Sequence, residues 1–178
     1  MSRLPPGAET RVLTEADAEA YRRLRLRALR DHPDLFGRAY EEAQSLKEMV
    51  EDFRSQHNGV ASFILGAFEG NLVGIVTCSR ERGIKRQHKA LIWGMYVAPE
   101  ARGRGIGRAL LLEAIERARA WPGLEQIWLS VGTHNRPAHA LYRSCGFEVF
   151  GLERRALKLG DGYFDEEQMV LYLDRSAP

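Results

Sequence analysis

The chain has 178 residues, 44% of them hydrophobic and 28% charged, which is typical of a soluble globular protein with its own core. A formal net charge of +2 and two distant cysteines, Cys78 and Cys145, give no support for nucleic-acid binding, a disulfide framework or a zinc site. No apolar run is long enough to span a membrane and the opening residues lack a signal-peptide core, so we expect one cytoplasmic domain over 1–178.

The first part of the chain predicts a short strand and two helices. Residues 1–8 are expected to form a flexible tail, and residues 10–13 a strand. Thr14 and, three residues later, Asp17 form a helix N-cap signature, and the helix continues to about Arg30 with one apolar face. A second helix is expected over 45–56, between a serine cap and an Asn-Gly pair.

The rest of the chain alternates β-prone runs with two further helices. The β-prone runs cover residues 61–68, 72–80, 89–98, 125–132, 147–159 and 163–173. One helix begins near Gly105 and ends before Trp-Pro-Gly, and a shorter helix follows Asn135 and ends at Gly146. This order predicts an α/β (α+β) fold with a mixed, mostly antiparallel central sheet of about seven strands flanked by helices.

The segment Arg-Gly-Arg-Gly-Ile-Gly at 102–107 lies where the longer helix begins, although glycine is a poor helix former. Bare N–H groups at a helix N-terminus bind anions, so a phosphate site is indicated. A Walker A loop would need lysine and then Ser or Thr after Gly107, but Arg108 and Ala109 follow. A dinucleotide fingerprint would need its last glycine one residue later and an acid at the end of the next strand, where Ser-Val-Gly stands.

Residues 88–150 resemble the cofactor-binding half of the GNAT superfamily of acetyl-CoA-dependent N-acetyltransferases. The resemblance rests on the pattern [QR]-x-x-G-x-[GA] at 102–107, on Met-Tyr-Val just before it, and on N-x-x-A-x-x-L-Y-x-x-x-G-F at 135–147. It implies a GNAT-like acyl-CoA N-acyltransferase fold without a metal. It also implies a cytoplasmic enzyme that moves an acetyl group from acetyl-CoA directly to a primary amine of a small molecule or a protein N-terminus, within a ternary complex.

The resemblance further implies which residues hold acetyl-CoA. Backbone N–H groups of the glycine turn would bind the pyrophosphate, and main-chain groups of the preceding strand would bind the pantetheine arm. One N–H group near Met95 or Tyr96 would polarise the thioester carbonyl. Asn135 matches a residue that holds the cofactor or orders water, and a plain N-cap role remains open for it. The implied cofactor-binding residues are Met95, Tyr96, Val97, Arg102, Gly103, Arg104, Gly105, Ile106, Gly107, Arg108, Asn135 and Tyr142.

Tyr142 matches the general acid of the family. A phenol with a pKa of about 10 can protonate a leaving thiolate with a pKa of about 8.5, and the alternative is a tyrosine packed with Leu141 and Phe147. The strand glutamate that many relatives use as the base is replaced here by Ile92 and Trp93. The base is therefore open between a water chain, a partly neutral amine and five side chains, Glu41, Glu42, Glu81, His88 and Asp165.

The acceptor is not identified by the sequence. Acidic residues at 41–42 and 161–167 favour a cationic amine, bound by the first two helices and the closing hairpin, or form only solvated turns. Two other functions remain open: a non-catalytic acyl-CoA-binding regulatory module, and a ribosome- or RNA-associated acetyltransferase that uses the basic stretch 80–89. No membrane partner is expected, and the resemblance allows a homodimer because relatives commonly pair through sheet edges.

Overall fold

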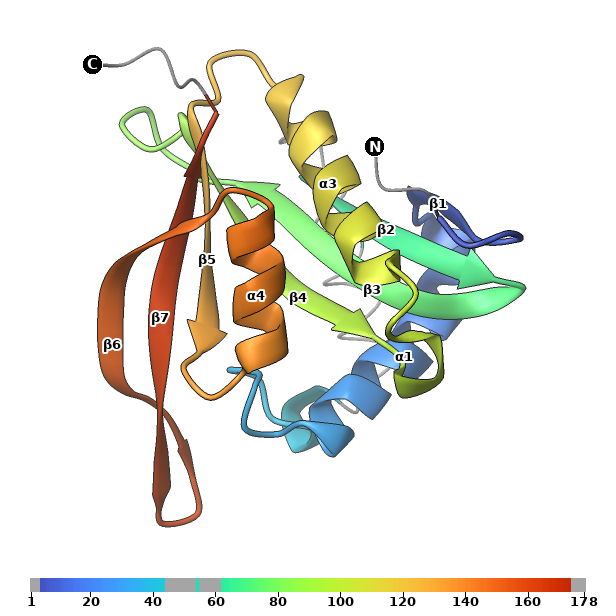
Figure 1. Cartoon of the computed structure of the whole chain (residues 1–178), viewed down its shortest axis with the longest axis horizontal. Helices are drawn as coiled ribbons and strands as arrows, with labels where there is room; N and C mark the ends of the chain where they lie inside the picture. The colour runs from blue at the N-terminus through green and yellow to red at the C-terminus, as the bar shows by residue number, and fades with distance from the viewer. Residues whose placement is uncertain (1–3, 44–53, 55–61, 174–178) are drawn as a thin grey trace.

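The protein is described by a computed structural model that covers residues 4–43, 54 and 62–173. Within these residues, seven strands form one sheet in the order β1-β2-β3-β4-β5-β7-β6 (Figure 1). Neighbouring strands are antiparallel except for β4 and β5, which are parallel. The predicted mixed, mostly antiparallel sheet is therefore confirmed.

The N-terminal elements follow the predicted order. β1 (Glu9–Val12) forms one edge of the sheet, and a 3-10 turn (Glu15–Asp17) leads into α1 (Ala18–Asp31). Thr14 donates its N–H to the Asp17 carboxylate at 2.8 Å, as the N-cap signature predicts. The helix expected over 45–56 lies outside the described residues apart from residue 54.

The following strands and helices also match the predicted runs. The elements are β2 (Ser62–Glu69), β3 (Asn71–Arg80), β4 (Lys89–Val97), α3 (Ile106–Arg119), β5 (Gln126–Gly132), α4 (Arg136–Ser144), β6 (Glu148–Leu159) and β7 (Gly162–Tyr172). Two further 3-10 turns cover Glu41–Ala43 and Pro99–Ala101. Among the helices described here, none is both long and apolar enough to cross a membrane.

The closing hairpin is inserted into the sheet through its last strand. β7 lies between β5 and β6 and pairs antiparallel with both. Met169, Val170 and Leu171 of β7 are buried, whereas β6 is exposed along most of its length and carries Glu153, Arg154 and Arg155. The more apolar strand therefore takes the inner position, and the charged strand forms the sheet edge.

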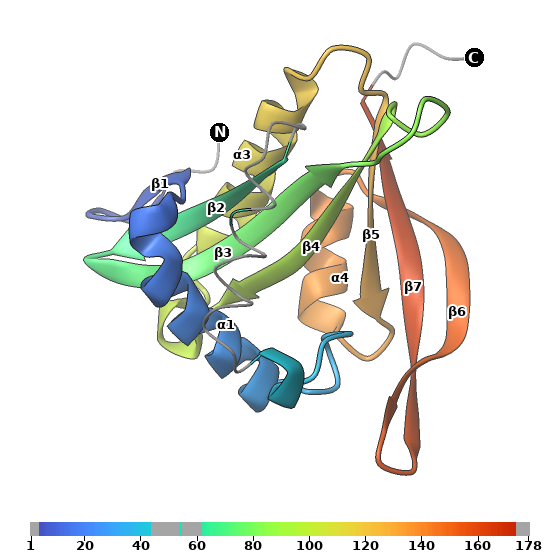
Figure 2. The same cartoon turned by 180° about the vertical axis from the view of Figure 1, so that it is seen from behind.

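Helices cover both faces of the sheet and enclose two hydrophobic clusters. α3 and α4 lie on one face (Figure 1), and α1 lies on the opposite face (Figure 2). The larger cluster joins α3 and α4 to the sheet and includes Leu110 and Leu129. The smaller cluster packs α1 against the other face and includes Leu24 and Ile75.

The two parallel strands at the centre of the sheet separate along their length. β4 and β5 are paired only from Lys89 to Leu91, opposite Gln126 to Trp128. Beyond this point β4 has a bulge at Gly94, whose φ of 63° is in the left-handed region that favours glycine. The unpaired ends of β4 and β5 leave a gap in the sheet between the two helical layers.

Candidate active site

A pocket of about 990 Å³ lies at the gap between β4 and β5. Its lining includes Gly107 and Leu141 from the face covered by α3 and α4, and Tyr21 and Arg25 from α1 on the other face. Because the sheet separates these two layers, one pocket can reach both only through the gap. Such a pocket can receive one molecule from each side of the sheet.

The glycine turn forms one wall of this pocket. Gly105 is the N-cap of α3 with a φ of 83°, and Gly103 has a φ of 75°, both in the left-handed region. A Cβ on Gly103 would meet no atom within 4 Å, so packing does not require glycine at this position. The backbone conformation, with its positive φ, is what favours glycine there. The N–H groups of the first helical turn have no acceptor within the helix, and they therefore suit an anion.

Gly107 differs from the other two glycines because it lies within α3. A Cβ on Gly107 would lie 3.5 Å from Cε of Met95, 3.6 Å from Cγ2 of Val97 and 3.6 Å from Cδ2 of Leu141. These are ordinary contact distances, so an alanine fits, whereas a longer side chain would extend into the space between β4 and α4. The absence of a side chain at Gly107 keeps this part of the pocket open.

The three arginines of the turn bind neighbouring groups of the protein. Nε of Arg102 donates to the carbonyl oxygen of Val97 at 2.8 Å, and its Nη2 lies 3.1 Å from Nε2 of His32. Arg104 forms an ion pair with Glu69. Nη1 of Arg108 donates to Oγ of Ser144 at 2.8 Å. These contacts hold the turn in place.

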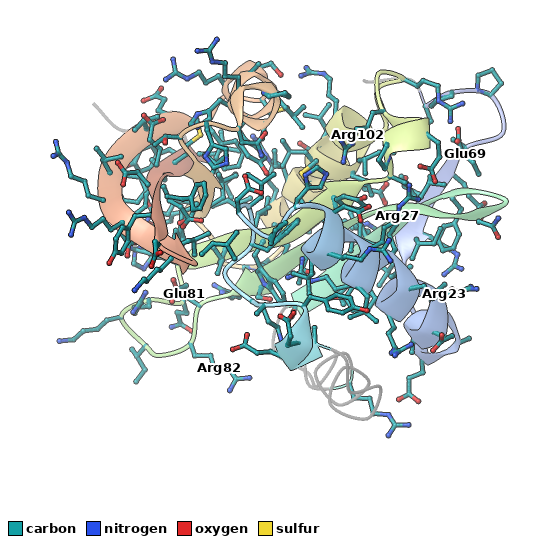
Figure 3. All side chains as sticks on the ribbon, turned by 90° about the horizontal axis from the view of Figure 1, so that it is seen from below. Arg23, Arg27, Glu69, Glu81, Arg82 and Arg102 are labelled. Carbon is teal, nitrogen blue, oxygen red and sulfur yellow. The ribbon has the colours of Figure 1, made fainter. Side chains whose placement is uncertain are left out.

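A second set of contacts joins the turn to α1. Arg27 of α1 donates to both carboxylate oxygens of Glu100, at 2.7 and 2.9 Å, so this pair is bidentate. Figure 3 shows Arg27 and Arg102 in the same part of the molecule, while Glu81 and Arg82 lie on a loop at the other side. The connection that precedes α3 is therefore fixed to both helical layers.

Tyr142 has its hydroxyl group at the pocket and its ring in the core. The residue is 8% exposed, and its ring centre lies 5.9 Å from that of Phe147. The hydroxyl of Tyr142 on α4 donates to Sδ of Met95 on β4 at 3.8 Å. Burial raises the pKa of Tyr142 to about 12, so the phenol is protonated at neutral pH.

The twelve predicted cofactor-binding residues are brought together with one exception. All of them line the pocket apart from Arg104, whose guanidinium is turned to Glu69. Asn135 lines the pocket and also caps α4, because its Oδ1 accepts the N–H of Ala138 at 3.3 Å. The N-cap role of Asn135 is therefore compatible with a contact to a ligand.

The five side chains considered as the base do not line this pocket. Asp165 accepts the N–H of Arg155 at 2.7 Å, and Glu81 accepts Nε1–H of Trp128 at 3.0 Å. Of the two residues at the usual glutamate position, Ile92 is buried in the larger core cluster. Both Ile92 and Trp93 line the pocket.

Glu166 is the carboxylate among the described residues that line the pocket. It lies on β7 beside Gly132 of β5 and Glu153 of β6. Burial, and then the nearby charge of Glu153, raise the pKa of Glu166. A carboxylate with a raised pKa is a stronger base than an ordinary surface carboxylate.

Sequence reasoning missed Arg25, and the sequence does carry a signal for it. Tyr21, Leu24, Ala28 and Leu29 define the apolar face of α1, and Arg25 falls on the same face by helical spacing. Arg25 is 6% exposed and lines the pocket. A charged residue on a buried helix face is unusual and indicates a special role.

The described residues contain no group of three or more side chains suited to hold a metal ion. The glycine turn, in contrast, fits a pyrophosphate, because its backbone takes a conformation that favours glycine and exposes the N–H groups of a helix N-terminus. A gap between strands and an anion site at its edge together define a transferase that binds an acyl-CoA.

Comparisons with known proteins give the family. The profile of the Acetyltransferase (GNAT) family matches residues 19–147. The L-amino acid N-acetyltransferase AaaT of Escherichia coli (strain K12) is 26% identical over 160 residues, which cover 89% of this chain and 96% of that protein. Spermidine N(1)-acetyltransferase of Vibrio cholerae is 27% identical over 144 residues, which cover 77% of this chain and 82% of that protein.

A solved structure agrees with these sequence matches. The crystal structure of a phosphinothricin acetyltransferase from Sinorhizobium meliloti in complex with acetyl-CoA aligns with a TM-score of 0.80 and 27% identity, over 94% of this chain and 89% of that one. The chain belongs to the GNAT acetyltransferase family. It is an N-acetyltransferase with an amine acceptor and acetyl-CoA as cosubstrate, and the predicted family, fold, activity and cosubstrate are confirmed.

Proposed function

We propose that this chain transfers the acetyl group of acetyl-CoA directly to the primary amine of a small molecule, with both substrates bound at once. The observation that supports this most is the pocket that passes through the sheet between β4 and β5. In this proposal acetyl-CoA enters from the face covered by α3 and α4, and the acceptor enters from the face covered by α1. The two then meet within the gap.

The glycine turn would hold the pyrophosphate of acetyl-CoA through the first-turn N–H groups of α3. Gly107 leaves room beside Met95 and Val97 for the pantetheine arm, and Asn135 lies at the N-terminus of α4 on the same pocket. An N–H group near Met95 or Tyr96 would donate to the thioester oxygen. A single donor of this kind is worth about 3–4 kcal/mol of the barrier.

Acetyl-CoA supplies the activated thioester, and side chains of this protein move the protons. The amine nitrogen forms its bond to the carbonyl carbon as the carbon–sulfur bond breaks, and the leaving thiolate takes the hydroxyl proton of Tyr142. A phenol with a pKa near 12 is a weak acid toward a thiol in water, whose pKa is about 8.5. Burial disfavours a free thiolate as well, so this proton transfer is easier in a dry site than in water.

Glu166 would accept the proton that the amine loses. It is the carboxylate among the described residues of the pocket, and burial and Glu153 raise its pKa. The tyrosinate and the protonated carboxylate formed in the reaction would return to their resting states by exchange with solvent. This assignment replaces the missing strand glutamate with a residue from another strand of the same sheet.

The test is the substitution Tyr142→Phe, assayed by thiol release with a panel of amines. Loss of a general acid typically costs about 10²–10⁴-fold in rate, and we expect kcat to fall within this range. The affinity for acetyl-CoA, measured by calorimetry, should change little because the ring and its contact with Phe147 are kept. Tyr163→Phe is the matched control, since Tyr163 is 49% exposed and lies away from the pocket lining. An unchanged kcat in Tyr142→Phe would exclude the acid role.

A further inference from the structure

Arg25 carries a buried guanidinium with an unpaired nitrogen at the pocket. The residue is 6% exposed, and its Nη1 has no hydrogen-bond partner in the described part of the chain. Its Cζ lies 4.8 Å from the centre of the Phe36 ring, which covers one side of the guanidinium. A buried charged donor without a partner destabilises the fold, so its presence in a pocket indicates that the missing partner is a ligand.

The charges around Arg25 point to an anionic ligand. Besides burial, which lowers its pKa, the described groups that act on this guanidinium are Tyr21 and Arg38, and neither is a carboxylate. Arg38 lines the same pocket and adds a second positive charge on the side of α1. Among the described lining residues, Arg102 and Arg108 belong to the glycine turn and α3 on the opposite side, and Glu166 is the carboxylate. A buried guanidinium with an unpaired donor on this side of the pocket disfavours a polyamine, whereas the sequence left open whether the acidic residues at 41–42 and 161–167 bind a cationic amine or form solvated turns.

Arg25 also lies close to the place where the acetyl group must be transferred. A Cβ on Gly94 would lie 3.7 Å from Nη1 of Arg25 and 3.8 Å from Oγ1 of Thr77. Gly94 directly precedes Met95, and consecutive Cα atoms are about 3.8 Å apart. Together these distances place Nη1 of Arg25 within about 10 Å of Cα of Met95. An anion on Arg25 and an amine that attacks beside Met95 can therefore belong to one small molecule.

We propose that the acceptor is an α-amino acid, whose carboxylate is bound by Arg25 while its amine faces the gap between β4 and β5. The planar guanidinium can donate two parallel hydrogen bonds to a carboxylate, which fixes both the position and the orientation of the amino acid. This inference rests on the proposed function, and it adds the chemical class of the acceptor. Thr77, which is 1% exposed, lies on the same side of Gly94 as Arg25, since its Oγ1 is 3.8 Å from the position of a Cβ on Gly94.

The first experiment compares matched acceptors by thiol release from acetyl-CoA. Each free amino acid is assayed beside its carboxamide and its decarboxylated amine, which keep the side chain and the reacting nitrogen. For the preferred side chain we expect kcat/KM to be at least about tenfold higher for the free acid, because a charge-assisted bidentate pair is lost in the other two. Equal or better turnover of the decarboxylated amines would overturn the proposal.

The second experiment substitutes the guanidinium. Arg25→Met should bring the ratio of kcat/KM between acid and carboxamide close to one, mainly through a higher KM for the acid. Arg25→Lys should keep part of the preference, since it keeps the charge and loses the planar fork. Arg23→Met is the control on the same helix, where the side chain is exposed on the outer surface of α1 (Figure 3). A preference that survives Arg25→Met would also overturn the proposal.

A binding measurement separates this inference from the proposed function. In the presence of coenzyme A, the preferred amino acid should raise the Tm of the unaltered protein and of Arg23→Met, and should not raise that of Arg25→Met. Arg25→Met itself should be at least as stable as the unaltered protein, because it removes an unpaired buried charge. A protein that acetylates amines but shows no such shift with any amino acid refutes the role of Arg25. A protein that binds no acetyl-CoA refutes the proposed function instead.

Discussion

Gly107 offers the sharpest test of how acetyl-CoA lies in this protein. An added Cβ would make only ordinary contacts with Met95, Val97 and Leu141, at 3.5–3.6 Å, so alanine fits without displacing its neighbours. Replacing glycine by alanine inside a helix stabilises it by about 0.5–1 kcal/mol. We therefore expect Gly107→Ala to be slightly more stable than the unaltered protein and to bind acetyl-CoA normally.

Gly107→Leu extends the side chain beyond this contact shell into the space between β4 and α4. If the pantetheine arm occupies that space, the leucine and the cofactor compete for the same volume. Saturation at one hundred times the Kd stabilises a protein by about 2.7 kcal/mol, which raises the Tm of a chain of this size by roughly 5–10 °C. We expect this shift in the unaltered protein and in Gly107→Ala, and its loss in Gly107→Leu.

The assay is thermal unfolding with and without acetyl-CoA, followed by circular dichroism so that the fold of each unliganded variant is checked. A Gly107→Leu variant that is folded and still shows the full shift would refute the path of the cofactor beside Met95. Gly105 is a poorer place for this test. Its φ of 83° strains any larger residue, so a loss of binding there could follow from a distorted turn.

Two further predictions concern titrating carboxylates. Glu166→Gln should lower kcat/KM by about 10²-fold for an amine of low pKa, and should remove the acidic limb of its pH profile, which burial and Glu153 shift above the ordinary carboxylate range. If the acidic limb of the pH profile is still present in Glu166→Gln, a group other than Glu166 is the base. The hydrogen bond from Arg11, with those from Thr14, lowers the pKa of Asp17 to about 2, so the ionised carboxylate stabilises the fold above about pH 4. This contribution, at most about 2 kcal/mol, is lost as the pH falls from about 4 to about 2, and Asp17→Asn should lack that part of the acid unfolding curve.

The sequence predicted most elements because their signals are local. Alternating apolar residues mark the strands, and caps such as Thr14 and Asn135 mark where helices begin. The glycine turn was also found, because it couples to motifs before and after it at fixed distances. The position of β7 between β5 and β6 was not predicted, since it depends on which strand buries Met169 and its neighbours against the rest of the sheet.

The parts of the site that escaped prediction depend on contacts between distant elements. Asp165 and Glu166 are neighbours on β7, and only the second lines the pocket, because successive side chains of a strand point to opposite faces. The pairing of β6 and β7 shifts register between Glu153 and Leu157, so sequence alternation alone does not show which residue faces inward. Gly94 could have been recognised, since a glycine within a strand pattern often marks a bulge.

Direct transfer has one chemical alternative, in which a protein nucleophile carries the acetyl group between the two substrates. The chain contains two cysteines, and both are free. Cys78 is fully buried, and burial raises the pKa of its thiol to about 12, so the reactive thiolate is scarce at neutral pH. Cys145 lies at the C-terminal end of α4, where Arg108 donates to its Sγ at 3.4 Å, and it does not line the pocket that Tyr142 reaches.

These positions leave neither thiol beside the gap where the acetyl group would be transferred, so we expect a sequential mechanism. Cys145→Ala should keep kcat within about twofold, because the side chain makes no contact with either substrate in this mechanism. Initial rates measured against both substrates should give intersecting double-reciprocal lines. Mass spectrometry after incubation with acetyl-CoA alone should find no acetylated protein. An acetyl adduct that an amine discharges, together with parallel lines, would instead require a covalent route through a side chain other than the two cysteines.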